Sequence, residues 1–146
     1  MLAASHAVAG AIIASQISDP LIAYSVALIS HPLLDLFPHW DLNTRHTHET
    51  KFRIIWTSLL DAGIGFSIGL LLFGSSVNIV TLLLCMFIAQ LPDWIEAPRH
   101  IFEWNFPPFS TIKKLQHFWH TKLCWPWGLI PQISLVILAI LIALKS

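Results

Sequence analysis

Residues 30–41 of the chain read SHPLLDLFPHWD, a stretch that combines apolar helix formers with two histidines and two aspartates. His31 and Asp35 lie four residues apart, so a helix through this segment presents both side chains on one face. His39 and Asp41 follow directly after Pro38, which favours the end of that helix. The stretch therefore predicts a helix that leaves an apolar environment while carrying polar ligand groups.

The composition is typical of membrane proteins. Of the 146 residues, 55% are hydrophobic and only 11% are charged, whereas soluble domains carry about 25% charged residues. The length suits one domain, covering residues 1–146. The formal net charge is zero, so the general basic field of a nucleic-acid-binding protein is absent. We therefore expect a single membrane-embedded domain whose partner is the lipid bilayer and not nucleic acid.

Apolar segments separated by turn residues predict an all-α bundle of about five membrane helices. Asp19-Pro20 separates the first two segments, and the sequence GSSVN at residues 74–78 separates the third from the fourth. The first two segments are near or below the length that spans a bilayer, roughly 17–25 residues. They therefore form either a tight hairpin or short spans. The expected helices cover residues 3–17, 20–36, 53–74, 78–96 and 127–144.

Lysine and arginine are distributed unevenly over the predicted loops. With five membrane helices, the loops 38–52 and 97–126 lie on the same side of the membrane and, together with Arg53 directly after the first loop, hold seven of the eight positive residues. Only Lys145 lies on the other side. Cytoplasmic loops of membrane proteins carry such an excess of positive charge. We therefore expect a multi-pass protein of the inner (cytoplasmic) membrane with its N-terminus and both long loops in the cytoplasm.

Ionisable side chains inside the predicted helices gather near the cytoplasmic side. An ionisable group at membrane depth costs several kcal/mol unless it is paired, so such residues are candidates for function. Neutral imidazole and carboxylate groups suit zinc, manganese or iron, and no cysteine lies near enough to suggest a thiolate site. We therefore predict a site for one to three divalent ions, with zinc preferred, whose candidate ligands are His6, His31, Asp35, Asp61, Asp93, His117 and His120.

Several of these residues also have a purely structural interpretation. His31 and Asp35 can form an internal hydrogen-bonded pair, because they share a helix face. Asp61 can act as a cap or pair with Arg53, which lies two turns away on the same predicted helix. Asp93 follows a proline and can cap a broken helix. The isolated His6 can be a satisfied histidine at a helix end.

The polar segment after Pro38 leaves two interpretations open. His39 and Asp41 either join the site as catalytic or supporting groups or belong to a simple turn. His46 and His48 lie further along the same polar loop, where solvation is the simpler interpretation.

Several motifs together resemble a known family. SHAVAG at residues 5–10, SHPLLDLFPHWD at 30–41, an aspartate in the next apolar helix and LPDWIE at 91–96 are similar to motifs of bacterial integral-membrane, metal-dependent hydrolases. That family is distantly similar to zinc-dependent phospholipase C and to single-strand-specific nucleases, helical enzymes that hold several zinc ions with histidine and aspartate. The resemblance covers most of the chain. It implies metal ligands at His6, His31, Asp35 and Asp93, with Asp61 and His117 or His120 as additions.

Three functions fit these residues. The first is a metal-dependent hydrolase (a phosphoesterase) acting on a phospholipid or lipid-linked phosphate at the cytoplasmic membrane face. In that hydrolase Asp61, His39 and Asp41 are the candidate catalytic residues. The second is metal transport or relay, which is disfavoured because no polar path continues to the far side of the membrane. The third is a structural role, in which a metal or His–Asp hydrogen bonds tie short helices together.

Overall fold

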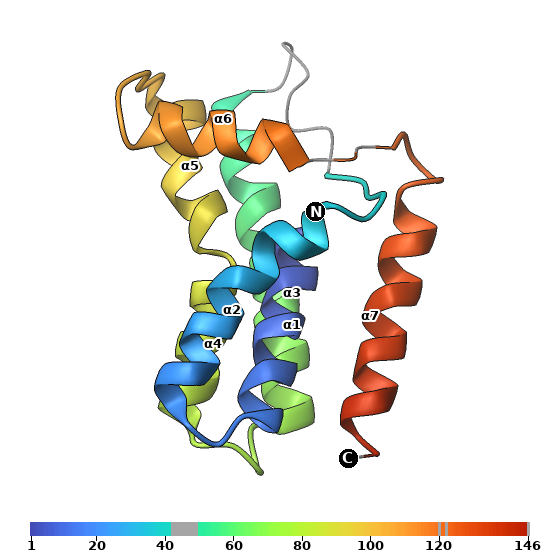
Figure 1. Cartoon of the computed structure of the whole chain (residues 1–146). Coiled ribbons are helices and arrows are strands. Elements are labelled where there is room, and N and C mark those ends of the chain that lie inside the picture. The colour runs from blue at the N-terminus through green and yellow to red at the C-terminus, as the bar shows by residue number, and fades with distance from the viewer. Residues whose placement is uncertain (42–49, 120, 122, 146) are drawn as a thin grey trace.

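The computed structural model describes residues 1–41, 50–119, 121 and 123–145, and its regular elements are α-helices (Figure 1). Among the described residues there is no strand, so the predicted all-α fold is confirmed. The helices in this part of the chain are α1 (Ala3–Gln16), α2 (Pro20–Asp35), α3 (Lys51–Phe73), α4 (Ile79–Ala89), α5 (Leu91–Phe102), α6 (Phe109–Trp119) and α7 (Leu129–Ala143).

Helix α1 is the centre of the bundle. It packs against α2, α3, α4 and α7, which run roughly alongside it, whereas α6 crosses one end of the bundle (Figure 1). A Cβ atom at Gly10 of α1 would lie 2.5 Å from the carbonyl oxygen of Cys85 on α4. One at Gly65 of α3 would lie 2.5 Å from Cα of Ala4 on α1. Only glycine fits at these two positions, because the helix backbones approach so closely that a Cβ atom would clash.

Side-chain caps fix where three of the helices begin. Oδ1 of Asp19 accepts hydrogen bonds from two backbone N–H groups in the first turn of α2, at 2.8 and 3.1 Å, and Pro20 occupies that turn. Asn78 caps α4 in the same way, and Thr50 caps α3. Side chains of this kind satisfy the N–H groups that have no partner within the helix. The structure has the predicted turns at Asp19-Pro20 and at residues 74–78.

The helix predicted over residues 78–96 is bent in the structure. Its two parts, α4 and α5, meet at Gln90 and are inclined to each other by 52°. Pro92 explains the break, because proline has no N–H to donate and its ring clashes with the carbonyl four residues earlier. The N–H of Asp93 donates to the carbonyl of Gln90 at 3.0 Å. The carbonyl of Ala89 is therefore left without its usual helical donor.

The connection expected over residues 97–126 contains helix as well as loop. It holds the last turns of α5 and all of α6, and these two helices pack against each other. Between them, Phe102, Trp104, Phe106 and Phe109 form a chain of aromatic contacts with ring centroids 5.3–5.7 Å apart. Aromatic pairs at this separation are stabilising. The aromatic contacts hold α6 against α5 at the end of the bundle.

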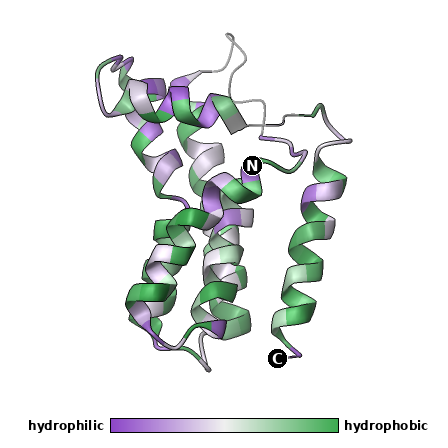
Figure 2. Cartoon of the chain, in the orientation of Figure 1, coloured by the Kyte–Doolittle hydropathy of each residue, from purple (hydrophilic) through white to green (hydrophobic). Residues whose placement is uncertain are grey.

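Apolar side chains cover much of the outer surface of the bundle. Large exposed hydrophobic residues lie on α2, α3, α4 and α7, and many hydrophilic residues gather at the end that carries the N-terminus, α5 and α6 (Figure 2). By length and composition, α3 can cross a membrane alone, and α4 with α5 can form a second, bent span. Helices α2 and α7 are apolar but shorter. The arrangement with five spans therefore stays a prediction.

Candidate metal centre and its cavity

Five polar side chains meet where α1, α2 and α5 converge. His6 comes from α1, His31 and Asp35 come from α2, and His39 comes from the segment after α2. Each of these four is fully buried, with 0% of its surface exposed. Asp93 approaches them from the first turn of α5. The structure thus brings together residues that are far apart in the sequence: His6 and Asp93 are separated by 87 positions (93 − 6).

The side-chain atoms of this cluster are separated by similar distances. Nε2 of His6 lies 3.3 Å from Oδ1 of Asp35, and Nε2 of His31 lies 3.4 Å from Oδ2 of the same residue. Nε2 of His31 also lies 3.5 Å from Oδ1 of Asp93. Nε2 of His39 is slightly further out, at 3.9 Å from Oδ1 of Asp35. One ligand atom each from His6, His31 and Asp93 all lie within 4.8 Å of one another, so these three can hold a metal ion.

His31 is held in the orientation that a metal ligand needs. Its Nδ1 lies 2.8 Å from the carbonyl oxygen of Ala89, the carbonyl that the bend at Pro92 releases from the helix. A carbonyl only accepts hydrogen bonds, so Nδ1 carries a proton, and in the neutral ring Nε2 is the nitrogen with a lone pair for a metal. Nδ1 of His39 likewise donates to the carbonyl of Phe37 at 2.7 Å. Metal-binding histidines commonly donate their second ring N–H in this way.

The imidazole rings of His6 and His31 stack on each other. Their centroids are 3.9 Å apart and their planes are inclined by 17°. Two positively charged rings at this distance would repel each other, so at least one of them is neutral. Both ring nitrogens of His6 and Nε2 of His31 are buried without a hydrogen-bond partner among the described residues. Because buried polar atoms are nearly always satisfied, these nitrogens favour a further partner such as a metal ion or water.

The spacing of the cluster fits a divalent ion with tetrahedral ligands. Two ligand atoms about 2.1 Å from a tetrahedral zinc lie about 3.4 Å from each other. Nε2 of His31 and Oδ1 of Asp93, which are 3.5 Å apart, agree with that value, and the ligand atoms of His6, His31 and Asp93 together lie within 4.8 Å of one another. The separation of 3.5 Å is longer than most N–H···O hydrogen bonds, which lie near 2.9–3.0 Å. The donor set of imidazole nitrogens and carboxylate oxygens, without sulfur, suits zinc, manganese or iron.

Asp35 is the anionic centre of the cluster. Its Oδ1 accepts a hydrogen bond from the amino group of Met1 at 2.6 Å, in addition to its contacts with the histidines. A positive group and imidazole rings therefore surround the carboxylate, which offsets the free energy needed to bury its charge. Towards an ion at this position, Asp35 would act as a ligand or hold His6 and His31 in place.

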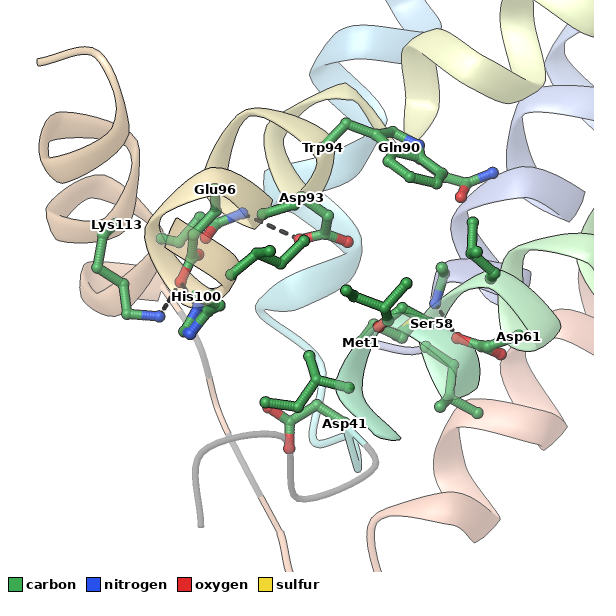
Figure 3. Close-up of a pocket in the computed structure, with 18 residues that line it drawn as sticks. Met1, Asp41, Ser58, Asp61, Gln90, Asp93, Trp94, Glu96, His100 and Lys113 are labelled. Carbon is green, nitrogen blue, oxygen red and sulfur yellow. Dashed lines mark hydrogen bonds and ion pairs between the residues drawn. The ribbon is translucent and has the colours of Figure 1, made fainter. Parts of the chain in front are cut away.

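A cavity of about 200 Å³ adjoins the cluster (Figure 3). Its walls come from the N-terminal residues, α3, α5 and α6. Asp93 lines it, has a side chain that is 37% exposed, and accepts a hydrogen bond from Nε2 of Gln116 at 3.0 Å. Because Asp93 belongs to both the cluster and the cavity wall, a molecule in the cavity can reach an ion held by the cluster.

Asp61 and Asp41 line the cavity beside this cluster. Oδ2 of Asp61 accepts a hydrogen bond from the N–H of Ala3 at 2.6 Å, so this carboxylate binds the start of α1. Neither residue belongs to the three-residue group of His6, His31 and Asp93. Both residues line the cavity, a position that suits a proton acceptor better than a metal ligand.

Of the two other histidines predicted as ligands, the structure describes His117, which does not join the cluster. His117 is exposed in the last turn of α6 and is not among the described residues that line the cavity. His120, His46 and His48 lie outside the described residues.

A second polar group, which the sequence did not predict as part of the site, lies on the α5–α6 side of the cavity. Glu96 is buried on α5 and accepts hydrogen bonds from Nε2 of His100 at 2.5 Å and from Nζ of Lys113 on α6. All three residues line the cavity. From sequence alone, Lys113 is one positive charge in a connection. The apolar residues that recur every three or four positions over 109–119 are the signal that would have predicted α6.

The ends of α3 and α5 that flank the cavity are joined by an exposed ion pair. Nζ of Lys51, in the first turn of α3, lies 2.9 Å from Oε1 of Glu103, just after α5. The hydrogen bond from Lys51 lowers the pKa of the Glu103 carboxyl below its usual value. Because both side chains are exposed, the pair contributes little to stability.

Comparisons of the chain with models of protein families, with curated proteins and with solved structures found no match. The case for a function therefore depends on the geometry of the cluster and its cavity.

Proposed function

We propose that the chain is a membrane-bound, metal-dependent hydrolase that acts on a phosphoester, a phospholipid or lipid-linked phosphate, at the cytoplasmic face of the inner membrane. The proposal is carried by one observation: His6, His31 and Asp93 converge within 4.8 Å, with three buried ring nitrogens that have no hydrogen-bond partner among the described residues. A divalent ion, zinc in preference to manganese or iron, would bind Nε2 of His31 and one ring nitrogen of His6, and would offset the buried charge of the carboxylates.

The open side of the cluster favours catalysis over a purely structural metal. Structural zinc sites are closed by protein ligands, whereas catalytic sites keep one position for water or substrate. The histidines of this cluster are fully buried, but Asp93 is partly exposed and borders the cavity. A substrate in the cavity therefore has access to the ion from one side.

The distribution of polar residues argues against transport. The described core below the cluster is apolar and consists of residues such as Ala11, Ala14, Leu82 and Met86. A carrier needs ligands along a path to both sides of the membrane. A polar cluster at one end of an apolar bundle matches an enzyme acting at the membrane surface better than it matches a carrier.

The distribution of positive charge supports the cytoplasmic placement. Arg99 and Lys113 belong to α5 and α6, at the end of the bundle where the cluster lies, and Lys145 follows α7 at the other end (Figure 1). Positive residues are enriched on the cytoplasmic side of membrane proteins. The cluster and its cavity would then face the cytoplasmic leaflet.

The chemistry divides among the residues as follows. When bound, a divalent ion supplies a Lewis acid for a phosphoryl oxygen and lowers the pKa of water to about 7. His6, His31 and Asp93 hold the ion, and Asp35 and His39 support them. Asp61 and Asp41, which line the cavity, orient the attacking water and accept its proton. Lys113 and His100 lie on the opposite wall, where a positive group stabilises negative charge on the phosphoryl group.

Metal content and hydrolysis test this proposal together. The protein is purified in mild detergent without a chelator or a histidine tag, and zinc, manganese and iron are counted by mass spectrometry. His31→Ala and Asp93→Asn should lower bound metal by about tenfold or more, while the matched control His117→Ala, an exposed histidine, should retain it. The wild type should hydrolyse a soluble phosphoester, and both site variants should not. A protein without metal after reconstitution, or metal loss in His117→Ala alone, would rule the proposal out.

A further inference from the structure

The cavity is divided into polar and apolar parts. Asp93 lies on α5 and is hydrogen-bonded to Gln116 of α6, and Glu96 and His100 follow it along α5, with Lys113 reaching Glu96 from α6 (Figure 3). Ile54, Ile55, Leu59, Trp94, Ala97 and Ile101 supply apolar walls from the facing helices α3 and α5. A ligand that fits this arrangement has a polar head and an apolar body.

The cavity is too small to enclose a whole amphiphile. Pockets that enclose a complete small ligand usually measure about 300–1,000 Å³, and this one measures about 200 Å³. It can hold a phosphate group and the first atoms attached to it. The rest of a larger ligand has to extend outside.

The outer surface next to the cavity is apolar. Leu59 lines the cavity and is also 49% exposed, so the cavity reaches the surface at α3. Phe52, Trp56 and Leu60 on the same helix are exposed as well. Most of α3 is unburied, and α3 is the helix that by length and composition can cross a membrane. An apolar chain that leaves the cavity here enters surroundings made of hydrocarbon.

We propose that the substrate is an amphiphilic phosphoester that enters laterally between α3 and α5. Its phosphate lies between Asp93 and the Lys113–His100 pair, and its alkyl chain passes Ile55 and Leu59 onto the exposed face of α3. The inference deepens the hydrolase function proposed above and rests on it for the identity of the reaction. The ammonium group of Lys113 donates to the phosphate, and Glu96 holds Lys113 and His100 on one wall by accepting a hydrogen bond from each.

Photo-crosslinking tests the position of the alkyl chain without requiring turnover. The protein is placed in phosphatidylcholine nanodiscs with a single-chain alkyl phosphate that carries a diazirine in the middle of its chain. After irradiation, labelled peptides are located by mass spectrometry. Labelling should concentrate on α3 and α5, and excess dodecyl phosphate should suppress it while excess dodecanol should not. Labelling spread evenly over α2, α3 and α7, or equal competition by both compounds, would overturn the proposal.

A matched pair of variants on α3 sharpens the test. Ile55→Trp fills the cavity, and Ile64→Trp places the same side chain at an exposed position that does not line the cavity. Specific labelling should fall about tenfold in the first, which corresponds to a loss of about 1.4 kcal/mol in binding, and should not change in the second. Equal labelling of both variants would overturn the proposal. Because Ile55→Trp can fail to fold, the wild-type labelling pattern is decisive by itself.

Hydrolysis of a soluble phosphoester separates this inference from the proposed function. Hydrolysis without specific labelling would leave the enzyme intact and refute lateral entry. Specific labelling without metal-dependent hydrolysis would support an amphiphile site and refute the hydrolase.

Discussion

Replacing Gly10 with alanine should disturb both the packing of α1 and the metal centre. A Cβ atom at this position would lie 2.5 Å from the carbonyl oxygen of Cys85 and 2.8 Å from Cα of Met86, both backbone atoms of α4. Backbone atoms cannot rotate away as a flexible side chain can, so α1 and α4 must move apart. His6 lies one turn before Gly10 on α1, and Ala89, which orients His31, lies one turn after Cys85 on α4.

The expected loss of stability is about 2 kcal/mol. Overpacking a close contact costs about 1–3 kcal/mol, and a clash with backbone belongs at the upper end. Alanine in place of glycine stabilises a helix by about 1 kcal/mol, which offsets part of that loss. Gly63→Ala is the matched control, because a Cβ atom there would meet nothing within 4 Å. That variant should be more stable by about 0.5–1 kcal/mol.

Equilibrium unfolding in mixed micelles gives the stability change, and metal counting by mass spectrometry gives the effect on the site. Gly10→Ala should lose about tenfold in metal affinity, since small displacements of supporting groups have effects of this size. Gly63→Ala should bind metal like the wild type. If the two variants unfold alike and bind metal alike, the close approach of α1 to α4 does not position the site.

Three further predictions concern contacts away from the cluster. Gln132→Leu removes the hydrogen bond to Ser5 Oγ at 2.8 Å that joins α7 to α1, and should destabilise the protein by about 1–3 kcal/mol in micelle unfolding because it leaves a buried hydroxyl without that partner; an unchanged midpoint would contradict this. Asn78→Ala removes the cap of α4 and should lower the free energy of unfolding by about 0.5–2 kcal/mol in the same assay, whereas Asn78→Ser, which keeps a capping side chain, should lose little stability. Glu103→Gln should barely change the unfolding midpoint at neutral pH, since its pair with Lys51 is exposed. The folded-state pKa of Glu103 is lowered, so its small contribution is present above the unfolded pKa and is lost as the pH falls through the folded pKa; a larger effect in acid than at neutral pH would contradict this.

Much of the helical layout can be predicted from the sequence, because its signals are local. The apolar segments are separated by Asp19-Pro20 and by residues 74–78, and caps at these positions define helix starts directly. The i, i+4 spacing of His31 and Asp35 also places two cluster residues on one face without knowledge of the tertiary structure. His6 lies a few residues from the start of the first segment, so it is expected at the same depth in the membrane as His31 and Asp35.

The features that could not be predicted depend on contacts between distant segments. The proline at position 92 is visible, but the sequence does not reveal that the bend frees the Ala89 carbonyl to orient His31. The hydrogen bond between Asp61 and the N–H of Ala3 joins residues 58 positions apart. The role of Lys113 required α6 to be recognised as a helix folded back on α5.

X-ray absorption spectroscopy at the zinc edge tests the central claim most directly, because it reports the atoms around the ion. The zinc-loaded protein should show nitrogen and oxygen ligands at about 2.0–2.1 Å, with the outer scattering typical of imidazole and no sulfur at about 2.3 Å. His31→Ala should lose part of the imidazole signal, and His117→Ala should keep all of it. A spectrum dominated by sulfur, or one that is identical in the wild type and in His31→Ala, would contradict the metal centre built from His6, His31 and Asp93.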